Sequence, residues 1–529
     1  MIGADKMSKS IKVTVYDTTL RDGSQGPKIN YTIEDKLLIT RKLDELGVDY
    51  IEGGWPMKGV NTKDYEYFKK VKQLELKHAV VTAFGSTRRA KNKVKDDPVL
   101  NSLLDAGTKT VTIFGKSWKL HAEKILNISP AENLKIIKES VEYLKSKKRE
   151  VIFDAEHFFD GFKDDPEYAL KCLLAAEAAG ADVLCLCETN GGALPFEVGE
   201  ITAEVMRSVK IKVGIHTHND AELAVANTLM AVKAGASQVQ GTMNGFGERT
   251  GNANLVSIIP ALAFKMGFST IPKKNLKKLK EVSHYIYEVS NIPPDDKQPY
   301  VGKNAFAHKA GVHANAVMKL SKAYEHMEPE LVGNLRQILV SDQAGASSLM
   351  YKAEQWGLDL HKDDPRTKDF IVRIKKLEQE GYEFEGADAS LELFLKKNLG
   401  KYKPFFELRG LRVIDEDRNG EIYSEATIKI KVKDRMEHTA AEGNGPINAL
   451  DTALRKALLK FYPAIKDMHL VDFKVRVLEG AEGTAAKVRV LIESSDEKNI
   501  WNTVGVSENV IEASWKALVD SVEYKLIKG

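Results

Sequence analysis

The sequence predicts an α/β fold: a (β/α)8 TIM barrel over residues 11–272, a helical linker over 273–400, and a C-terminal α+β domain over 401–529. Three observations lead to this prediction. In the first region, short β-rich runs alternate with amphipathic stretches, about thirty residues apart, which is the length of a strand, a helix and two loops. In the second region, polar helical patterns replace these runs. After Tyr402, alternating apolar and polar residues indicate half-exposed strands.

The first region contains eight β-rich runs. Their starts lie near Val13, Val48, His78, Thr110, Val151, Val183, Val213 and Val239. Eight strand–helix units in this length are typical of a (β/α)8 barrel. A doubly wound open sheet is the alternative. It would more naturally carry a Gly-rich phosphate loop after its first strand, and Asp22-Gly23-Ser24-Gln25-Gly26 is not such a loop.

Helix boundaries support the same segmentation. Thr32 and Asp35 resemble a capping box that opens the first helix, with Asp in place of the usual Glu. A glycine closes several helices just before the next strand, because glycine accepts the left-handed conformation that ends a helix. These steps are Leu46-Gly47, Ala106-Gly107, Ala179-Gly180 and Ala234-Gly235.

The C-terminal region contains a weak internal duplication. The segment 442–454 resembles the segment 503–518, and each follows strand-like residues with a Gly-containing stretch and a helical pattern. We therefore expect a pseudo-symmetric α+β module. In the linker, one further segment, 306–315, carries two histidines and is followed by Tyr324 and Glu325.

Composition excludes several classes of protein. With 43% hydrophobic residues, 29% charged residues and a net charge of +3, the chain has the balance of an ordinary globular protein, so we expect no nucleic-acid partner. No apolar stretch is long enough to span a membrane, and the polar start at Met1–Ser10 lacks the apolar core of a signal peptide. Three cysteines cannot build a disulfide framework and suit a reducing cytoplasm. Cys185 and Cys187 lie in a predicted strand, where burial is expected, although a metal role stays open.

Unusual polar residues gather where the predicted strands end. The active sites of (β/α)8 barrels lie at the C-terminal ends of the strands, and polar groups would be costly within an apolar barrel interior. This rim therefore predicts an active site. Its residues are Asp17, Arg21 and Asp22 after the first strand, Asp154, Glu156 and His157 after the fifth, Glu188, Thr189 and Asn190 after the sixth, His216, His218, Asn219 and Asp220 after the seventh, and 244–252 after the eighth.

His216 and His218 are the strongest candidates for metal binding. On a strand they point to the same side, about 7 Å apart along it, and converge on one ion if a third ligand closes the site. Asp22 or Asp17 would supply that ligand. Two histidines and a carboxylate suit Mn, Zn, Co, Fe or, with waters, Mg, and also form the facial triad of iron oxygenases. Arg21 beside this site favours an electrophilic pocket for an α-keto acid, since its guanidinium can hold a carboxylate or keto oxygen.

Four motifs together resemble one enzyme family. They are Asp-Thr-Thr-Leu-Arg-Asp-Gly at 17–23, His-Thr-His-Asn-Asp at 216–220, Gly-Glu-Arg-Thr-Gly-Asn at 247–252 and Gly-Val-His at 311–313. The chain is similar over almost its whole length to the isopropylmalate, homocitrate and citramalate synthases. These are barrel acyltransferases that condense acetyl-CoA with an α-keto acid. The segments 50–56, 83–89 and 153–161 are most similar to the citramalate branch, which implies pyruvate as the acceptor and a role in isoleucine biosynthesis.

The resemblance implies a ligand set for a divalent ion, Mn²⁺, Mg²⁺ or Zn²⁺. Asp22, His216 and His218 match the family's ligands, and Asn252 matches an asparagine close to the ion and is a weaker fourth candidate.

The resemblance also implies catalytic roles. Arg21 would hold the keto acid and steady the developing oxyanion, and Thr189 matches a residue that contacts the acceptor carboxylate. Glu156 and His313 match the pair that moves protons, with Tyr324 near them. His313 lies outside the barrel sequence, which fits the family's dimers.

The C-terminal module resembles the family's feedback domain, where an end-product amino acid binds between subunits. Isoleucine is the expected inhibitor and a homodimer or higher homo-oligomer the expected assembly. Two stretches, which we expect to be loops, would wrap the ligand: 439–446, with Gly443, Asn444, Gly445 and Pro446, and 503–507, with Val504 and Gly505. Their glycines allow close backbone approach, and the helix N-termini that follow can receive a carboxylate. The alternative is a dimerisation domain without an effector site.

The sequence also allows other functions and other roles for some residues. A sister synthase acting on 2-oxoisovalerate or 2-oxoglutarate, an acyl-CoA lyase, and a non-catalytic metal-binding protein are the alternative functions. A small pocket would exclude longer acceptors, and Trp55, Phe84 or Phe114 would shape it. His157 packs behind Glu156 or acts in catalysis, and His308 is a linker residue rather than a catalytic one. Glu248-Arg249 forms an internal ion pair or positions a ligand.

Overall fold

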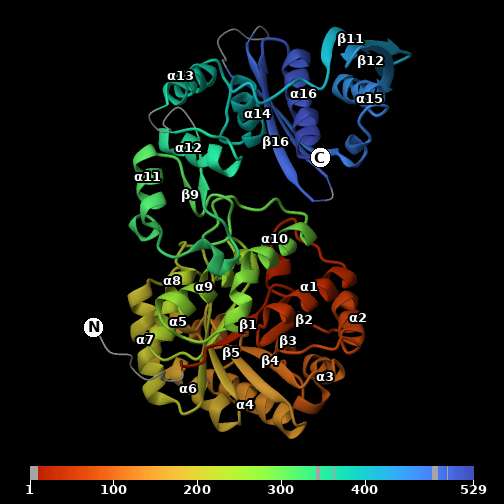
Figure 1. Cartoon of the computed structure of the whole chain (residues 1–529). Helices are drawn as coiled ribbons and strands as arrows, with labels where there is room; N and C mark the ends of the chain where they lie inside the picture. Colours follow the sequence, from red (N-terminus) through yellow and green to blue (C-terminus); the bar gives the residue numbers. More distant parts are fainter. Residues whose placement is uncertain (1–9, 341–345, 362–363, 479–485, 497) are drawn as a thin grey trace. The chain divides into compact units, whose positions relative to one another are not determined.

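The computed structural model describes residues 10–340, 346–361, 364–478, 486–496 and 498–529 (Figure 1). All of the N-terminal segment Met1–Ser10 except Ser10 therefore lies outside the described residues. The chain divides into two compact units. The first consists of Met1–Phe306 with Met327–Arg336, and the second of Ala307–His326 with Gln337–Gly529.

The first unit contains a closed barrel of eight parallel strands in sequence order, so the predicted (β/α)8 barrel is confirmed. The barrel closes where Thr14 of the first strand pairs with Gln238 of the last. The strands are β1 (Thr14–Asp17), β2 (Tyr50–Gly54), β3 (Val80–Ser86), β4 (Thr110–Lys116), β5 (Glu150–Glu156), β6 (Val183–Glu188), β7 (Lys212–Thr217) and β8 (Gln238–Gly241).

Helices alternate with these strands and surround the barrel (Figure 1). The capping box of Thr32 and Asp35 opens the first of them, as predicted. The four closing glycines have φ values of 93°, 68°, 94° and 121° at Gly47, Gly107, Gly180 and Gly235. The helices of this unit are α1 (Ile33–Leu46), α2 (Thr62–Val71), α3 (Pro98–Asp105), α4 (Pro130–Ser146), α5 (Phe158–Asp164), α6 (Pro166–Ala178), α7 (Pro195–Ser208), α8 (Ala224–Lys233), α9 (Leu255–Pro260) and α10 (Leu279–Val289).

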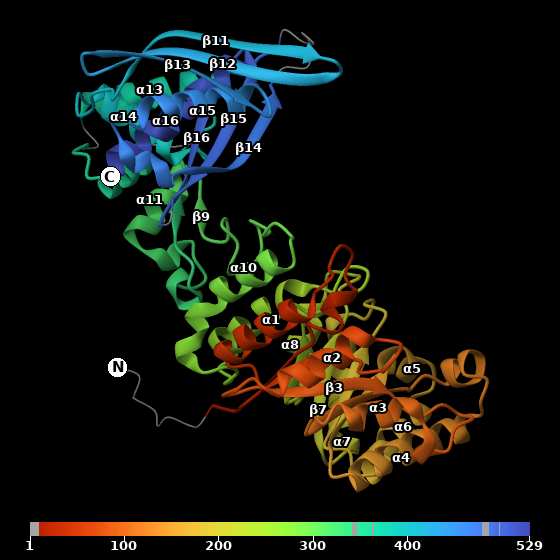
Figure 2. The same ribbon diagram turned by 90° about the vertical axis from the view of Figure 1, so that its right-hand side faces the viewer.

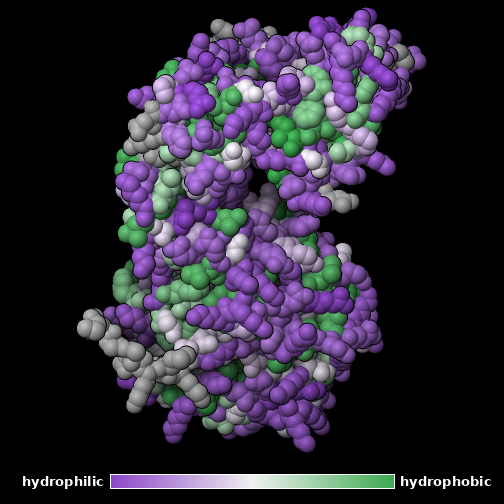
Figure 3. Space-filling view, viewed as in Figure 1, coloured by the Kyte–Doolittle hydropathy of each residue, from purple (hydrophilic) through white to green (hydrophobic). Residues whose placement is uncertain are grey.

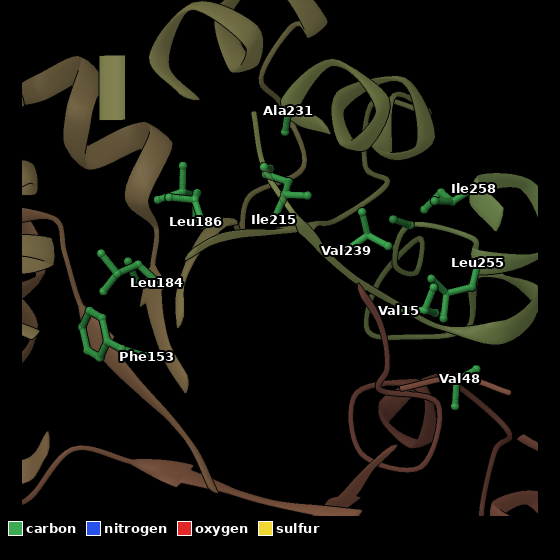
Figure 4. Packing of buried hydrophobic residues seen from close by; sticks show 14 of the residues in the cluster. Val15, Val48, Phe153, Leu184, Leu186, Ile215, Ala231, Val239, Leu255 and Ile258 are labelled. Carbon is green, nitrogen blue, oxygen red and sulfur yellow. The ribbon is translucent and has the colours of Figure 1, made fainter. Parts of the chain in front are cut away.

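The main hydrophobic core lies between the strands and the helices. Figure 4 shows strand residues such as Val15, Leu184 and Ile215 in this layer, together with Ala231 of α8 and Ile258 of α9. Side chains alternate along a strand, so the neighbours of these residues face the barrel interior. The interior differs from the apolar core that we expected, because fully buried Glu52 and Gln240 lie in it. Hydrogen bonds among the interior side chains offset the cost of burying them.

The second unit begins with short elements and helices: β9 (Ala307–His308), α11 (Gly311–Lys319), β10 (Gln337–Ile338), α12 (Ala346–Gln355), α13 (Pro365–Gln379) and α14 (Asp388–Asn398). The predicted duplication follows as two three-stranded antiparallel sheets, each succeeded by one helix. Figure 2 shows the first sheet as a long ribbon against which α15 lies. The elements are β11 (Glu407–Arg418), β12 (Glu421–Val432), β13 (Arg435–Gly443), α15 (Pro446–Leu458), β14 (His469–Val477), β15 (Val488–Ser495), β16 (Ile500–Ser507) and α16 (Val510–Lys528).

The prediction of loops at 439–446 and 503–507 is wrong for most of these residues. Residues up to Gly443 belong to β13, and Val504 and Gly505 belong to β16. Close strand–helix packing explains the two strand glycines. A Cβ on Gly443 would lie 2.3 Å from the nitrogen of Ala449, and one on Gly505 would lie 2.0 Å from the oxygen of Ala513.

No helix among the described residues is long and apolar enough to cross a membrane. On the face shown in Figure 3, hydrophilic side chains predominate and hydrophobic ones are scattered among them.

Candidate active site

Three buried donor groups converge at the C-terminal mouth of the barrel. His216 and Thr217 are the last two residues of β7, and His218 follows directly after the strand. The side chains of His216 and His218 lie on the same side, as alternation predicts, with their Nε2 atoms 3.3 Å apart. Oδ2 of Asp22 lies 3.5 Å from Nε2 of His216 and 4.0 Å from Nε2 of His218. The three ligand atoms lie within 4.8 Å of one another. The structure thus brings the predicted donors together in a candidate metal centre.

The charge and bonding of these groups fit a divalent cation. Burial lowers the pKa of His218 to about 4 and also lowers the pKa of His216, so both rings present neutral nitrogens. Burial opposes ionisation of Asp22, but Arg21 and the two histidines hold its pKa well below its usual range. Oδ1 of Asp22 and Oδ1 of Asn252 are buried and have no hydrogen-bond partner among the described residues. One anionic oxygen, two neutral nitrogens and two free oxygens are a suitable donor set for such an ion.

Asp17, the alternative third ligand, is turned away from this site. Its neighbour Tyr16 faces the barrel interior, where it bonds to Glu52 and Thr112, so Asp17 points to the opposite side of β1. There its carboxylate accepts hydrogen bonds from the backbone and hydroxyl of Thr19. Asp17 therefore shapes the turn that carries Asp22.

Arg21 is held at the mouth by two carboxylates and an aromatic ring. Its Nε donates to Oε2 of Glu52 at 2.5 Å, and its Nη1 donates to Oδ2 of Asp22 at 3.0 Å. Its guanidinium carbon lies 3.8 Å from the centroid of the Phe84 ring. Nη2 has no hydrogen-bond partner within the described part of the chain, and Arg21 lines the cavity at the mouth. This N–H group is therefore available to an oxygen atom of a bound ligand.

An aromatic wall, formed by Trp55, Phe84 and Phe114, bounds one side of this cavity. The rings of Phe84 and Phe114 stack with centroids 5.5 Å apart, and Trp55 meets both edge-on at 6.2 and 6.0 Å. All three line a cavity of about 390 Å³ that also contains Arg21 and the metal donors. All three aromatic residues that the sequence offered as pocket-shaping therefore reach the cavity.

Glu156 and Thr189 lie at the same mouth. Glu156 is half-buried and its Oε2 lies 2.5 Å from Nζ of Lys116. The hydroxyl of Thr189 accepts a hydrogen bond from the backbone N–H of His157, and both Glu156 and Thr189 line the cavity. The ring of His157 packs against that of His121, with centroids 4.3 Å apart, so the packing role is the better description of His157.

The proposed internal pair Glu248-Arg249 was wrong, because Arg249 binds a different carboxylate. Its Nε and Nη2 donate to the two oxygens of Asp220 at 2.7 and 2.8 Å. Nη2 also donates to the backbone oxygen of Thr189 at 2.7 Å. Arg249 thereby joins the loops after β6, β7 and β8, and Glu248 and Arg249 both line the cavity.

His313 and Tyr324 belong to the second unit, where their rings stack with centroids 4.3 Å apart. His308 of the same unit bonds through Nε2 to Oε1 of Glu325 at 3.1 Å, in keeping with a structural role. Of the predicted effector residues, only Asn444 and Gly445 connect β13 to α15, and Pro446 is the first residue of that helix.

The sequence analysis did not identify the buried side chains in the barrel interior that hold the site residues in place. Glu52 accepts hydrogen bonds from Tyr16, Thr18 and Arg21, and Gln240 links Asp154 to His216. The available signal was a charged or amide residue in the middle of a buried parallel strand, where apolar residues are usual.

A second support fixes the segment that carries Trp55. Lys36 and Asp64 form a buried ion pair, and Asp64 also accepts a hydrogen bond from the backbone of Trp55 at 2.9 Å. Gly54 has a φ of 135°, and a Cβ there would lie 2.3 Å from Asp64, so this turn requires glycine. The pair thus determines where Trp55 stands in the aromatic wall.

Cys185 and Cys187 are buried, as expected. Together with Asp154 they form a second group of close potential ligand atoms in the barrel interior. Burial raises the pKa of Cys185 far above its usual value, which keeps this thiol protonated in the interior.

Comparisons with known proteins cover nearly the whole chain. A family model described as HMGL-like matches residues 12–286, one described as homocitrate synthase post-HMGL domain-like matches 300–382, and the LeuA allosteric (dimerisation) domain matches 385–526. The chain is 56% identical over 520 residues to an (R)-citramalate synthase of Aquifex aeolicus and 54% identical over 519 residues to one of Geobacter sulfurreducens, with 98% of both chains covered in each case. It is 30% identical over 519 residues to a 2-isopropylmalate synthase of Methanocaldococcus jannaschii, covering 98% of this chain and 95% of that one.

Proposed function

The chain belongs to the (R)-citramalate synthase family, and we propose that its barrel mouth condenses acetyl-CoA with pyruvate to form citramalate and CoA. The observation that carries this proposal is the meeting of Arg21, the Asp22–His216–His218 donor group and an aromatic wall in one cavity. The reaction is a Claisen condensation. A base removes a proton from the acetyl methyl group, the resulting enolate attacks the keto carbon, and hydrolysis of the thioester releases CoA.

Asp22, His216 and His218 would hold the divalent ion, with Asn252 as a further oxygen donor. Bound there, Mn²⁺, Mg²⁺ or Zn²⁺ would polarise the keto group of the acceptor. Arg21 contributes the N–H group that Glu52 and Asp22 leave free, and this group donates to the oxygen on which negative charge develops. Because two carboxylates hold the guanidinium in place, little reorganisation is needed when that charge appears.

The aromatic wall supports pyruvate as the acceptor. Trp55, Phe84 and Phe114 hold one another by ring contacts, so the wall cannot easily retreat from a larger substituent. Pyruvate places a methyl group there, whereas 2-oxoisovalerate places an isopropyl group. Pocket discrimination of a methylene or so is worth about 1–3 kcal/mol, which is about 10–200-fold in kcat/KM.

Glu156 is the proposed base for the acetyl methyl group. It lies in the cavity, where its Oε2 is 2.5 Å from Nζ of Lys116. Thr189 would donate its hydroxyl to the acceptor carboxylate. For His313 and Tyr324 the proposal of proton transfer rests on the family resemblance alone.

The C-terminal module is the proposed site of assembly and regulation. Its match to an allosteric dimerisation domain supports a homodimer, and isoleucine is the proposed inhibitor because citramalate leads to this amino acid. The backbone N–H of Gly445 and those of the first turn of α15 after Pro446 would donate to a carboxylate, whereas Asn444 donates its N–H to Oδ1 of Asn448. Gly443 packs against α15 and Gly505 packs against α16, and these two residues and Val504 are proposed to contribute to the effector site.

The test is release of free CoA thiol from acetyl-CoA with a panel of keto acids. Pyruvate is expected to give the highest kcat/KM, at least about tenfold above 2-oxoisovalerate. Preference for 2-oxoisovalerate or 2-oxoglutarate would instead assign the chain to a sister synthase activity.

Metal dependence is tested by chelation and substitution. Chelator should abolish turnover, and Mn²⁺ or Mg²⁺ should restore it. Asp22→Ala and His216→Ala should remove activity without unfolding the protein, while His78→Ala, at the opposite end of the barrel, should retain it. Full turnover after exhaustive chelation would contradict the metal assignment.

A further inference from the structure

We infer that Gln240 is a positioning residue that fixes the ring orientation and the tautomer of His216 from inside the barrel. This inference rests on the proposed function, since it takes His216 to be a metal ligand. It adds a residue to the site that neither lines the cavity nor touches the substrates.

The hydrogen bonds of Gln240 define its role. Gln240 is fully buried on β8 and is the direct pairing partner of His216 on β7. Its Oε1 lies 3.2 Å from Nδ1 of His216, and its Nε2 donates to Oδ1 of Asp154 on β5 at 3.0 Å. With the amide nitrogen facing Asp154, the amide oxygen faces the imidazole. Nδ1 of His216 therefore carries the proton, and the lone pair of Nε2 points toward Asp22 and His218.

His216 and His218 differ in the hydrogen bonding of their Nδ1 atoms. Nδ1 of His218 is buried and has no hydrogen-bond partner within the described residues. His216 is therefore the ligand whose tautomer is set before an ion binds, and the hydrogen bond to an acceptor also makes Nε2 a better donor. Asp154 accepts from the other end of the amide through Oδ1, so that both ends of the Gln240 side chain are hydrogen-bonded. Burial, with the nearby charge of Glu52, raises the pKa of Asp154 to about 8, so this acid adds little charge to the interior near neutral pH.

The experiment measures cation binding without substrates. Gln240→Met preserves the approximate volume and removes both hydrogen bonds. Its affinity for Co²⁺ and Mn²⁺, measured by calorimetry, should fall about 10–100-fold, and the visible spectrum of bound Co²⁺ should change. Gln240→Glu should keep affinity within about threefold, because a carboxylate oxygen still accepts from Nδ1 of His216 and the protonated Asp154 can donate to the other oxygen.

Gln238 supplies the matched control. It lies two residues earlier on the same strand, is equally buried, and has no hydrogen bond to His216. Gln238→Met should bind the cations as the wild type does. An equal loss in this variant would show that the effect comes from barrel packing and would overturn the inference, as would unchanged binding by Gln240→Met.

Further measurements distinguish failure of the inference about Gln240 from failure of the proposed function. If Gln240→Met does not fold, the nitrogen shifts of His216 in the metal-free wild type decide. A proton on Nδ1 supports the inference, and a proton on Nε2 refutes it. A wild type that binds cations but forms no citramalate would refute the proposed function while leaving the role of Gln240 standing. A wild type that binds no cation would refute both.

Discussion

Glu52→Gln should disable the enzyme without altering any group that contacts the substrates. Glu52 is completely buried on β2 and accepts three short hydrogen bonds, from Tyr16 at 2.6 Å, Thr18 at 2.7 Å and Arg21 at 2.5 Å. Glutamine has the same shape, and its oxygen can still accept from Thr18 and Arg21. The hydroxyl of Tyr16 can turn to donate to Thr112, 2.8 Å away, and accept from the new amide. The substitution therefore removes charge and leaves no polar atom unpaired.

The magnitude follows from the loss of that charge. Hydrogen bonds to charged groups contribute about 1.5–3 kcal/mol, against about 0.5–1.5 kcal/mol for neutral ones. With three bonds weakened, we expect a loss of about 2–4 kcal/mol in the free energy of unfolding. Arg21 would also swing toward Asp22, its remaining carboxylate partner. A displacement of about 1 Å can cost about 100-fold in rate, so we expect kcat/KM for pyruvate to fall by about that factor.

Urea denaturation and CoA-thiol release measure the two effects separately. Glu150→Gln is the control: Glu150 also accepts from a tyrosine and a threonine, Tyr50 and Thr110, but it lies at the opposite end of the barrel. The Glu150→Gln variant should lose some stability and keep kcat/KM within about twofold, because Glu150 holds no residue of the active-site cavity in place. If Glu52→Gln retained wild-type kcat/KM, or if the control lost as much activity, Glu52 would not be the residue that holds Arg21.

Three other predictions concern specificity, regulation and pH. Trp55→Ala should raise kcat/KM for 2-oxoisovalerate relative to pyruvate by at least about tenfold. Phe196→Ala, which changes an exposed side chain outside the cavity, should leave that ratio unchanged. An unaltered ratio in Trp55→Ala would show that the aromatic wall does not cause the specificity. Isoleucine should inhibit the intact enzyme more strongly than leucine or valine, and a chain ending at Leu399 should lose the inhibition. Indifference of the intact enzyme to all three would refute feedback, and inhibition that survives truncation would place the effector site elsewhere. Burial raises the pKa of Glu188 from 4.5 to about 7, so between these pH values the folded protein keeps a proton that the unfolded chain releases. The stability from this group is lost as the pH rises through that window, and Glu188→Gln should flatten the corresponding part of the stability–pH curve; an unchanged slope would contradict the assignment.

Local pattern was enough to predict the barrel and the pair of candidate metal-ligating histidines. Strand and helix periodicities repeat along the chain, and the closing glycines mark the boundaries, so the order of elements follows from near neighbours in sequence. His216 and His218 are two residues apart on a strand, and alternation alone places them on one side. The duplication in the C-terminal module was visible for the same reason, because each half carries its own strands and helix.

Closure of the barrel decided which residues contact one another at the site, because it brings together residues that are far apart in the sequence. The choice of Asp22 over Asp17 depends on which face of β1 turns inward, because Asp17 at the end of that strand points away from the interior whereas Asp22 lies in the turn that follows. Glu52 meets Arg21, and Asp154 meets Gln240, only because the strands surround a common interior. Arg249 selects Asp220 over its neighbour Glu248 because a bidentate contact needs a carboxylate on a facing loop. The sequence by itself determined which chemical groups stand at the ends of strands; the closed sheet determined their partners, because hydrogen bonds depend on distance in space and not on distance along the chain.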